Sequence, residues 1–141
     1  MFIILLVNSV IVALVVLIHY EVLLQLSDLI PKLTIKHRLR IVLGVLGALI
    51  AHTIEVWIFA VTYYYMNGAE NWGYLQGSFN GSLLDCVYYS FTTYTTLGFG
   101  DIEPIGAIRF LTGVEALTGL VLITWSASFL FIEMQRYWKL K

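Results

Sequence analysis

Residues 82–101 read SLLDCVYYSFTTYTTLGFGD. The first part of this stretch predicts a helix, and the last part predicts non-helical backbone. Ser82 and the acid three residues later, Asp85, form the pattern of a helix N-cap. A helix from this cap to about Thr95 has about four turns, too few to cross a bilayer. We therefore expect a re-entrant helix, which enters the membrane from one side and returns to it.

Residues 96–100, TLGFG, follow this helix, and glycine stands at every second position from 98. Because glycine adopts backbone dihedrals closed to other residues, Gly98 and Gly100 allow the carbonyls to point one way, with Leu97 and Phe99 packed behind them. Non-helical backbone within a membrane is tolerated only where it lines a wet cavity. A column of inward carbonyls replaces the water shell of a bare monovalent cation. One strand supplies only part of such a ring, so we expect assembly around a rotation axis.

The composition around this stretch is that of a membrane protein. Of 141 residues, 60% are hydrophobic and 12% are charged, whereas soluble domains have roughly 25% charged residues. A net charge of −1 and a single cysteine, Cys86, exclude a nucleic-acid-binding surface and a disulfide scaffold. Three runs reach the roughly 20 apolar residues that a spanning helix needs: about 2–24, 39–66 and 105–134.

The basic residues predict the orientation. Those between the first two runs are Lys32, Lys36, Arg38 and Arg40, and those after the third are Arg136, Lys139 and Lys141. The positive-inside rule places this loop and the C-terminus in the cytoplasm, and the N-terminus outside the cell membrane. The outer ends carry the aromatic anchors Tyr63, Tyr64, Tyr65 and Trp72. The basic loop also suits anionic lipid head groups, although topology alone explains it.

The run Thr95–Asp101, TTLGFGD, resembles the selectivity-filter signature of potassium channels, commonly TTVGYGD. With its flanking runs, about two-thirds of the chain is similar to the prokaryotic single-pore-domain potassium channels. The resemblance implies an all-α integral membrane fold with three transmembrane helices, a re-entrant pore helix and an extended filter between the second and third, assembled as a homotetramer. It also implies passive K⁺ conduction, no catalysis, and no cofactor besides the permeant ions.

Roles for individual residues follow from the same resemblance. K⁺ would bind at Thr96, Leu97, Gly98 and Phe99, with Gly100 completing the filter and Asp101 at its outer mouth. Support for the filter would come from Thr92, Thr95 and Tyr88, and Gly119 falls where a hinge glycine is common. Phe99 replaces the commoner tyrosine and so lacks the hydroxyl that braces the filter from behind.

We divide the chain into four parts on this basis. They are an extra transmembrane helix (1–30), a cytoplasmic basic loop (31–38), a pore domain (39–134) and a cytoplasmic tail (135–141). The resemblance assigns no role to the first part.

Glu55 and Glu115 lie deep within the second and third apolar runs, each roughly 15 Å from the outer end. An intramembrane carboxylate is functional or hydrogen-bonded, so these acids either take part in gating or are bonded to threonine or His52 as packing behind the pore helix. His19 and His52 show no ligand spacing, and we expect no metal site there. Helical spacing places Phe131 on the face that would line the inner cavity, where it is either a hydrophobic gate or a lipid contact.

Two other functions remain open. The chain is a non-selective Na⁺/K⁺ channel if Phe99 leaves the filter loose, or a non-conducting membrane regulatory subunit. A purely structural role does not require two glycines in 96–100, which favours conduction.

Overall fold

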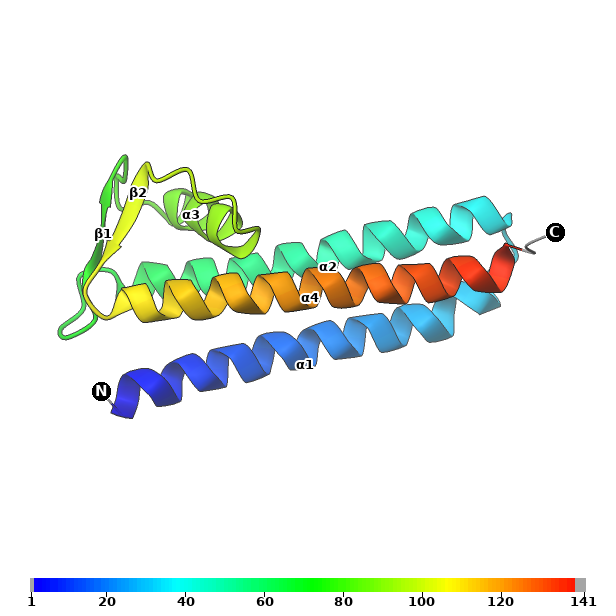
Figure 1. Cartoon of the computed structure of the whole chain (residues 1–141), viewed down its shortest axis with the longest axis horizontal. Coiled ribbons are helices and arrows are strands. Elements are labelled where there is room, and N and C mark those ends of the chain that lie inside the picture. Colours follow the sequence, from blue (N-terminus) through cyan, green and yellow to red (C-terminus); the bar gives the residue numbers. More distant parts are fainter. Residues whose placement is uncertain (1, 139–141) are drawn as a thin grey trace.

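The structure, a computed structural model, describes residues 2–138 and contains three long helices, one short helix and a two-stranded ribbon. The elements are α1 (Phe2–Lys32), α2 (His37–Met66), β1 (Tyr74–Gly77), α3 (Leu83–Tyr94), β2 (Ile102–Ile105) and α4 (Ile108–Tyr137). The long helices lie side by side, and α3 and the ribbon gather near one end of α2 and α4 (Figure 1). Lys139 and Lys141, used above to predict the orientation, lie outside the described residues.

The three long helices are long and apolar enough to cross a membrane, which confirms the three predicted runs. α1 is longer than its run, because the helix continues past the last apolar residues through Pro31 to Lys32. In this polar end Lys32 pairs with Asp28 one turn earlier, with 2.6 Å between Nζ and Oδ2. The helix therefore ends at Lys32, two residues after the boundary predicted at residue 30.

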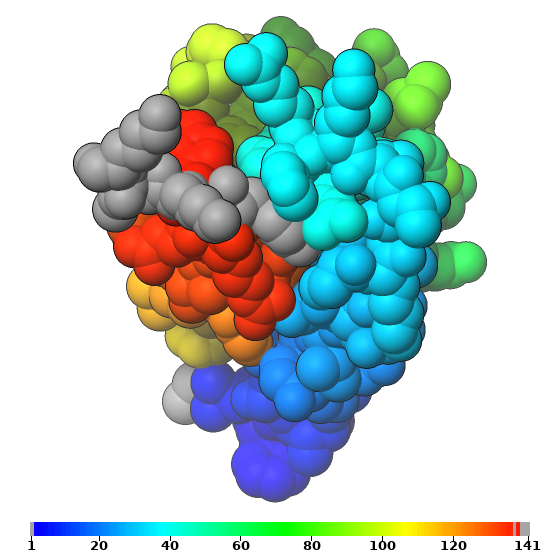
Figure 2. Space-filling model, turned by 90° about the vertical axis from the view of Figure 1, so that its right-hand side faces the viewer, coloured from blue at the N-terminus to red at the C-terminus, as the bar shows by residue number. Residues whose placement is uncertain are grey.

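α1 packs against both α2 and α4. Seen down the helices, α1 lies on one side of the α2–α4 pair and the chain that contains α3 lies on the other (Figure 2). The helix that the family resemblance leaves unassigned is therefore joined to the rest of the chain along the two helices that flank α3.

The ribbon was not expected from the sequence. β1 and β2 pair antiparallel, from Tyr74 opposite Ile105 to Gly77 opposite Ile102. Each strand has four residues, and Pro104 stands within β2, so neither shows the alternating pattern of a half-buried strand. The ribbon connects the end of α2 to the start of α4. Its two strands are the only strands in residues 2–138 of an otherwise helical fold.

α3 begins where the sequence predicts. Ser82 Oγ accepts a hydrogen bond from the backbone N–H of Asp85 at 3.0 Å, the bond of an N-cap. The helix ends at Tyr94, close to the predicted end. Its cap therefore sets where the short helix starts.

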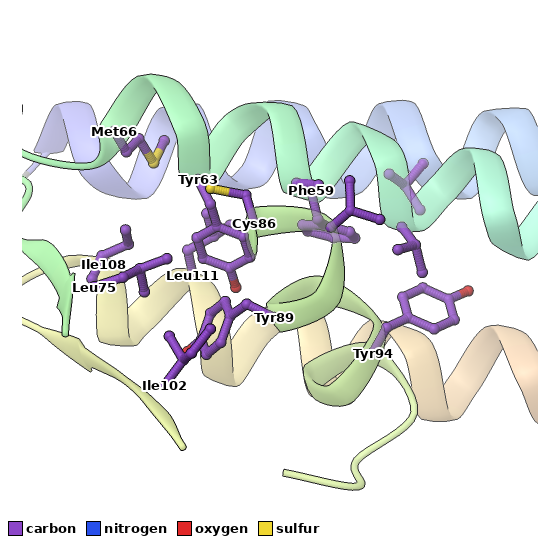
Figure 3. Close-up of a cluster of buried hydrophobic side chains, with 14 of the residues drawn as sticks. Phe59, Tyr63, Met66, Leu75, Cys86, Tyr89, Tyr94, Ile102, Ile108 and Leu111 are labelled. Atoms are coloured by element: carbon purple, nitrogen blue, oxygen red, sulfur yellow. The ribbon is translucent and has the colours of Figure 1, made fainter. Parts of the chain in front are cut away.

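The hydrophobic core lies where α3 meets α2, α4 and the ribbon (Figure 3). Cys86 and Tyr89 of α3 are buried there against Phe59 and Tyr63 of α2 and Leu111 of α4. Cys86 is thus a small packing residue of α3. Tyr63 is fully buried, so its predicted place at the membrane interface is wrong: the α3 helix covers it.

Replacing Ser82 by alanine removes the cap of α3. We expect the free energy of unfolding in detergent micelles to fall by about 1 kcal/mol, because the Asp85 N–H loses its partner. Chemical denaturation followed by circular dichroism measures the change. Ser78→Ala, which removes a nearby hydroxyl that does not cap the helix, is the control, and an equal loss in both variants would contradict the role of the cap.

Candidate functional site

The backbone after α3 alternates in handedness along residues 96–100. Thr96, Gly98 and Gly100 have positive φ angles of 59°, 48° and 75°, whereas Leu97 and Phe99 do not. Such an alternation turns successive N–H groups to one side of the chain and leaves the carbonyls for the other. The sequence predicts this freedom at the two glycines; the left-handed Thr96 was not foreseen, because β-branched residues rarely adopt that conformation.

Hydrogen bonds to α3 hold this segment in place. Gly98 N–H donates to the carbonyl of Thr92 at 2.9 Å, and Thr96 N–H donates to the carbonyl of Thr93 at 2.9 Å. Thr92, one of the predicted supports, thus contacts the segment through its backbone. The hydroxyl of Thr95, another predicted support, instead donates to the carbonyl of Phe91 in its own helix at 2.7 Å.

Asp101 ends the segment and is bonded to α3 as well. The hydroxyl of Tyr88 donates to Asp101 Oδ2 at 2.8 Å. This bond to a carboxylate raises the pKa of Tyr88 above its ordinary value, because losing the proton would place two anions together. Tyr88 therefore remains a donor at neutral pH and links the far end of the segment to α3.

The two large side chains of the segment do not pack within the chain. Leu97 is 59% exposed and Phe99 is 65% exposed, so neither side chain is buried within the single chain, and their packing behind the carbonyls stays a prediction. Behind the segment lies an open hollow of about 390 Å³ lined by residues that include Thr92, Thr96 and Phe99, and by Thr112 and Ala116 of α4. Packing of these side chains requires atoms from outside the chain.

Glu55 of α2 is fully buried behind the C-terminal end of α3. Its Oε1 lies 2.8 Å from Nδ1 of His19, and its Oε2 lies 3.1 Å from Nδ1 of His52 and accepts from the hydroxyl of Tyr94. The predicted partnership with His52 is confirmed. His19 and Tyr94 were missed, because they lie 36 and 39 residues away in the sequence.

Glu115 of α4 is fully buried on the other side of α3. Its Oε1 accepts from Ser90 Oγ at 2.5 Å and its Oε2 accepts from the hydroxyl of Tyr63 at 2.5 Å. Hydrogen bonds of this kind offset the several kcal/mol that a buried carboxylate otherwise costs. Among the described residues the donors to Glu115 are a serine and a tyrosine, and the predicted threonine is not one of them.

Gly119 lies where α4 crosses the end of α3. A Cβ atom there would lie 2.1 Å from the carbonyl oxygen of Tyr94, closer than two such atoms approach. The missing side chain therefore lets α4 contact the last residue of the short helix. α4 runs without a break through Gly119, so the described conformation explains the glycine by packing, and a hinge there stays a prediction.

The predicted inner face of α4 is open in the chain. Its residues are Leu120, Ile123, Thr124, Ala127 and Phe131, all of them exposed. Phe131 is 57% exposed, which agrees with both of its predicted roles, the gate and the lipid contact.

Replacing Gly119 by alanine tests the contact with Tyr94. We expect a loss of about 1–3 kcal/mol in the free energy of unfolding, because α4 must move away from α3. Gly113→Ala is the matched control, since a Cβ at this second glycine of α4 meets no atom within 4 Å. Denaturation in micelles measures both, and equal stability of the two variants would show that the close approach is absent.

Comparison with known proteins agrees with this arrangement. The family model described as "Ion channel" matches residues 51–136, more than half of the chain, from within α2 through α3 to the end of α4. No curated protein and no solved structure matches the chain. The matched region contains Glu55, Glu115 and the whole of residues 95–101, and the three long helices are long and apolar enough to span a membrane. The chain therefore belongs to this ion-channel family and is a multi-pass membrane protein.

Proposed function

We propose that the chain is the subunit of a potassium-selective channel, in which four copies bring their residues 96–100 around one axis. The observation that carries this proposal is the alternation of positive φ at Thr96, Gly98 and Gly100. A backbone of this kind offers successive carbonyls to a dehydrated K⁺. Thr96, Leu97, Gly98 and Phe99 supply the ion sites, and Gly100 closes the filter toward Asp101.

The exposed surfaces of the chain support assembly. Leu97 and Phe99 are exposed beside the segment, and a second hollow beside α3 is lined by Leu84, Tyr88 and Phe91. Neighbouring subunits around a four-fold axis would cover these side chains, since each filter strand packs against the pore helices around it. The open face of α4 would then line the inner cavity.

Charge supports the proposed direction of the pore. The chain between α2 and α4 carries the exposed acids Glu70, Asp101 and Glu103, which concentrate cations at an outer mouth. The C-terminal, partly negative end of α3 lies just before Thr96 and faces the inner cavity in this arrangement. We place the N-terminus outside and the α1–α2 connection in the cytoplasm.

Anionic lipid is a proposed partner at the α1–α2 connection. Two of the four basic residues there are already engaged: Lys32 pairs with Asp28, and Arg40 donates to the carbonyl of Leu33 at 2.6 Å. Lys36 and Arg38 are exposed and are the stronger candidates for contact with lipid phosphate.

Ion flux through the purified protein in liposomes tests the proposed function. With K⁺ or Na⁺ as the only permeant cation, we expect K⁺ flux to exceed Na⁺ flux, and Gly98→Ala to abolish it. Gly68→Ala is the matched control. Both glycines have a positive φ, and an added Cβ meets no atom within 4 Å in either place, so both substitutions introduce similar backbone strain and only one changes the filter.

The outcomes separate the candidate functions. Equal flux of both ions would replace the proposal with a non-selective cation channel, the function that the missing hydroxyl of Phe99 favours. Absence of flux at every tested voltage and pH in the wild type would favour a non-conducting subunit. Equal flux through the Gly98 and Gly68 variants would contradict the assignment of residues 96–100 as the selectivity filter.

Removing the hydroxyl of Tyr88 tests the brace between α3 and Asp101. We expect Tyr88→Phe to lower the preference for K⁺ over Na⁺, because the outer end of the filter loses its hydrogen bond to the short helix. The reversal potential in mixed ions measures the preference. Tyr65→Phe, at an exposed position on α2, is the control, and an unchanged reversal potential in both variants would show that the bond does not support selectivity.

A further inference from the structure

Two histidines and a glutamate from α1 and α2 meet in the interior. His52 and Glu55 lie one turn apart on α2, and His19 reaches them from α1. His19 and Glu55 are fully buried, and 16% of the side chain of His52 is exposed. One ligand atom from each residue, an imidazole nitrogen or a carboxylate oxygen, lies within 4.8 Å of the other two.

The hydrogen bonds of this cluster converge on the carboxylate of Glu55. Nδ1 of His19 lies 2.8 Å from Glu55 Oε1, the distance of an Nδ1–H donor to a carboxylate. Ser126 Oγ of α4 lies 3.4 Å from Nε2 of the same ring, where it can accept a proton once Nδ1 binds an ion. Nδ1 of His52 lies 2.9 Å from the hydroxyl of Tyr94, which donates its own proton to Glu55. A buried carboxylate contacted by two imidazoles attracts a cation, and an ion that binds there replaces the protons on the imidazole nitrogens.

We propose that His19, His52 and Glu55 form a site for a divalent transition-metal cation. Imidazole and carboxylate together suit Zn²⁺, Fe²⁺ or Co²⁺, whereas Ca²⁺ and Mg²⁺ prefer oxygen ligands alone. Ligand bonds to such ions are about 2.0–2.2 Å long, so two ligand atoms of a tetrahedral ion are about 3.4 Å apart. Small movements of the three side chains therefore suffice to enclose an ion.

The surroundings of the cluster are those of a metal site in a helix bundle, where ligands project from facing helices. Ser126 contacts the outer nitrogen of His19, and the His19 ring lies 5.3 Å from the Trp125 ring, measured between centroids. Contacts of this kind fix the tautomer and orientation of a ligating histidine.

A bound metal would join α1 to the remainder of the chain. Glu55 also accepts from Tyr94, the last residue of α3, so metal ligation competes directly with the bond that holds this end of the short helix. The metal site does not depend on the proposed conduction, because its ligands lie outside residues 96–100.

Cobalt titration of the purified full-length protein tests the proposal. Protein freed of metal by chelation is titrated with Co²⁺, and the visible ligand-field absorption is followed. We expect saturation at one Co²⁺ per chain, with Zn²⁺ displacing it, and at least tenfold weaker binding in His52→Gln and Glu55→Gln. The control is His37→Gln, which removes the histidine at the first residue of α2, outside the cluster.

The outcomes decide the proposal even if a variant fails to fold. Absence of a saturable Co²⁺ spectrum in the wild type would overturn it, whatever the variants do. Equal weakening by His37→Gln would also overturn it, because binding would then not belong to the cluster. A Zn²⁺-dependent rise in the melting temperature that is present in the wild type and lost in His52→Gln would support it, and neither measurement requires ion flux.

Discussion

The position of α3 depends on two buried carboxylates that reach it from opposite sides. Glu55 of α2 accepts from Tyr94, and Glu115 of α4 accepts from Ser90. Removing one hydroxyl donor from a buried carboxyl group costs about 1–3 kcal/mol. Because both bonds fall in the second half of α3, this half is held more firmly than the capped start of the helix.

The geometry of residues 96–100 depends on this position of α3. Its N–H groups at Thr96 and Gly98 reach carbonyls of Thr93 and Thr92, so the segment can alternate in handedness only if the last turn of α3 stays where it is. Gly119 of α4 lies against Tyr94 in the same last turn of α3. Glycine within a helix costs about 0.5–1 kcal/mol relative to alanine, and here it permits a contact between α4 and Tyr94 that no other residue allows.

α1 extends the same network beyond the two helices that flank the site. His19 places an imidazole against Glu55, and Ser126 of α4 lies against the same ring. A chain of side chains therefore runs from α1 through Glu55 to Tyr94, one residue before Thr95. This connection gives the additional helix a physical route to the segment on which the proposed function rests, and it explains why polar residues are tolerated in the middle of apolar helices.

The three apolar runs, the Ser82 cap and the two glycines of residues 96–100 were predictable from the sequence, because each depends on local pattern: length in apolar residues, cap spacing and backbone freedom. The ribbon was not, since four-residue strands carry no period. The positive φ of Thr96 and the burial of Tyr63 come from contacts with α3 that no local pattern records. The cluster of His19, His52 and Glu55 was hidden for the same reason. The i, i+3 spacing of His52 and Glu55 is visible in the sequence, but only the packing of α1 against α2 brings His19 to them.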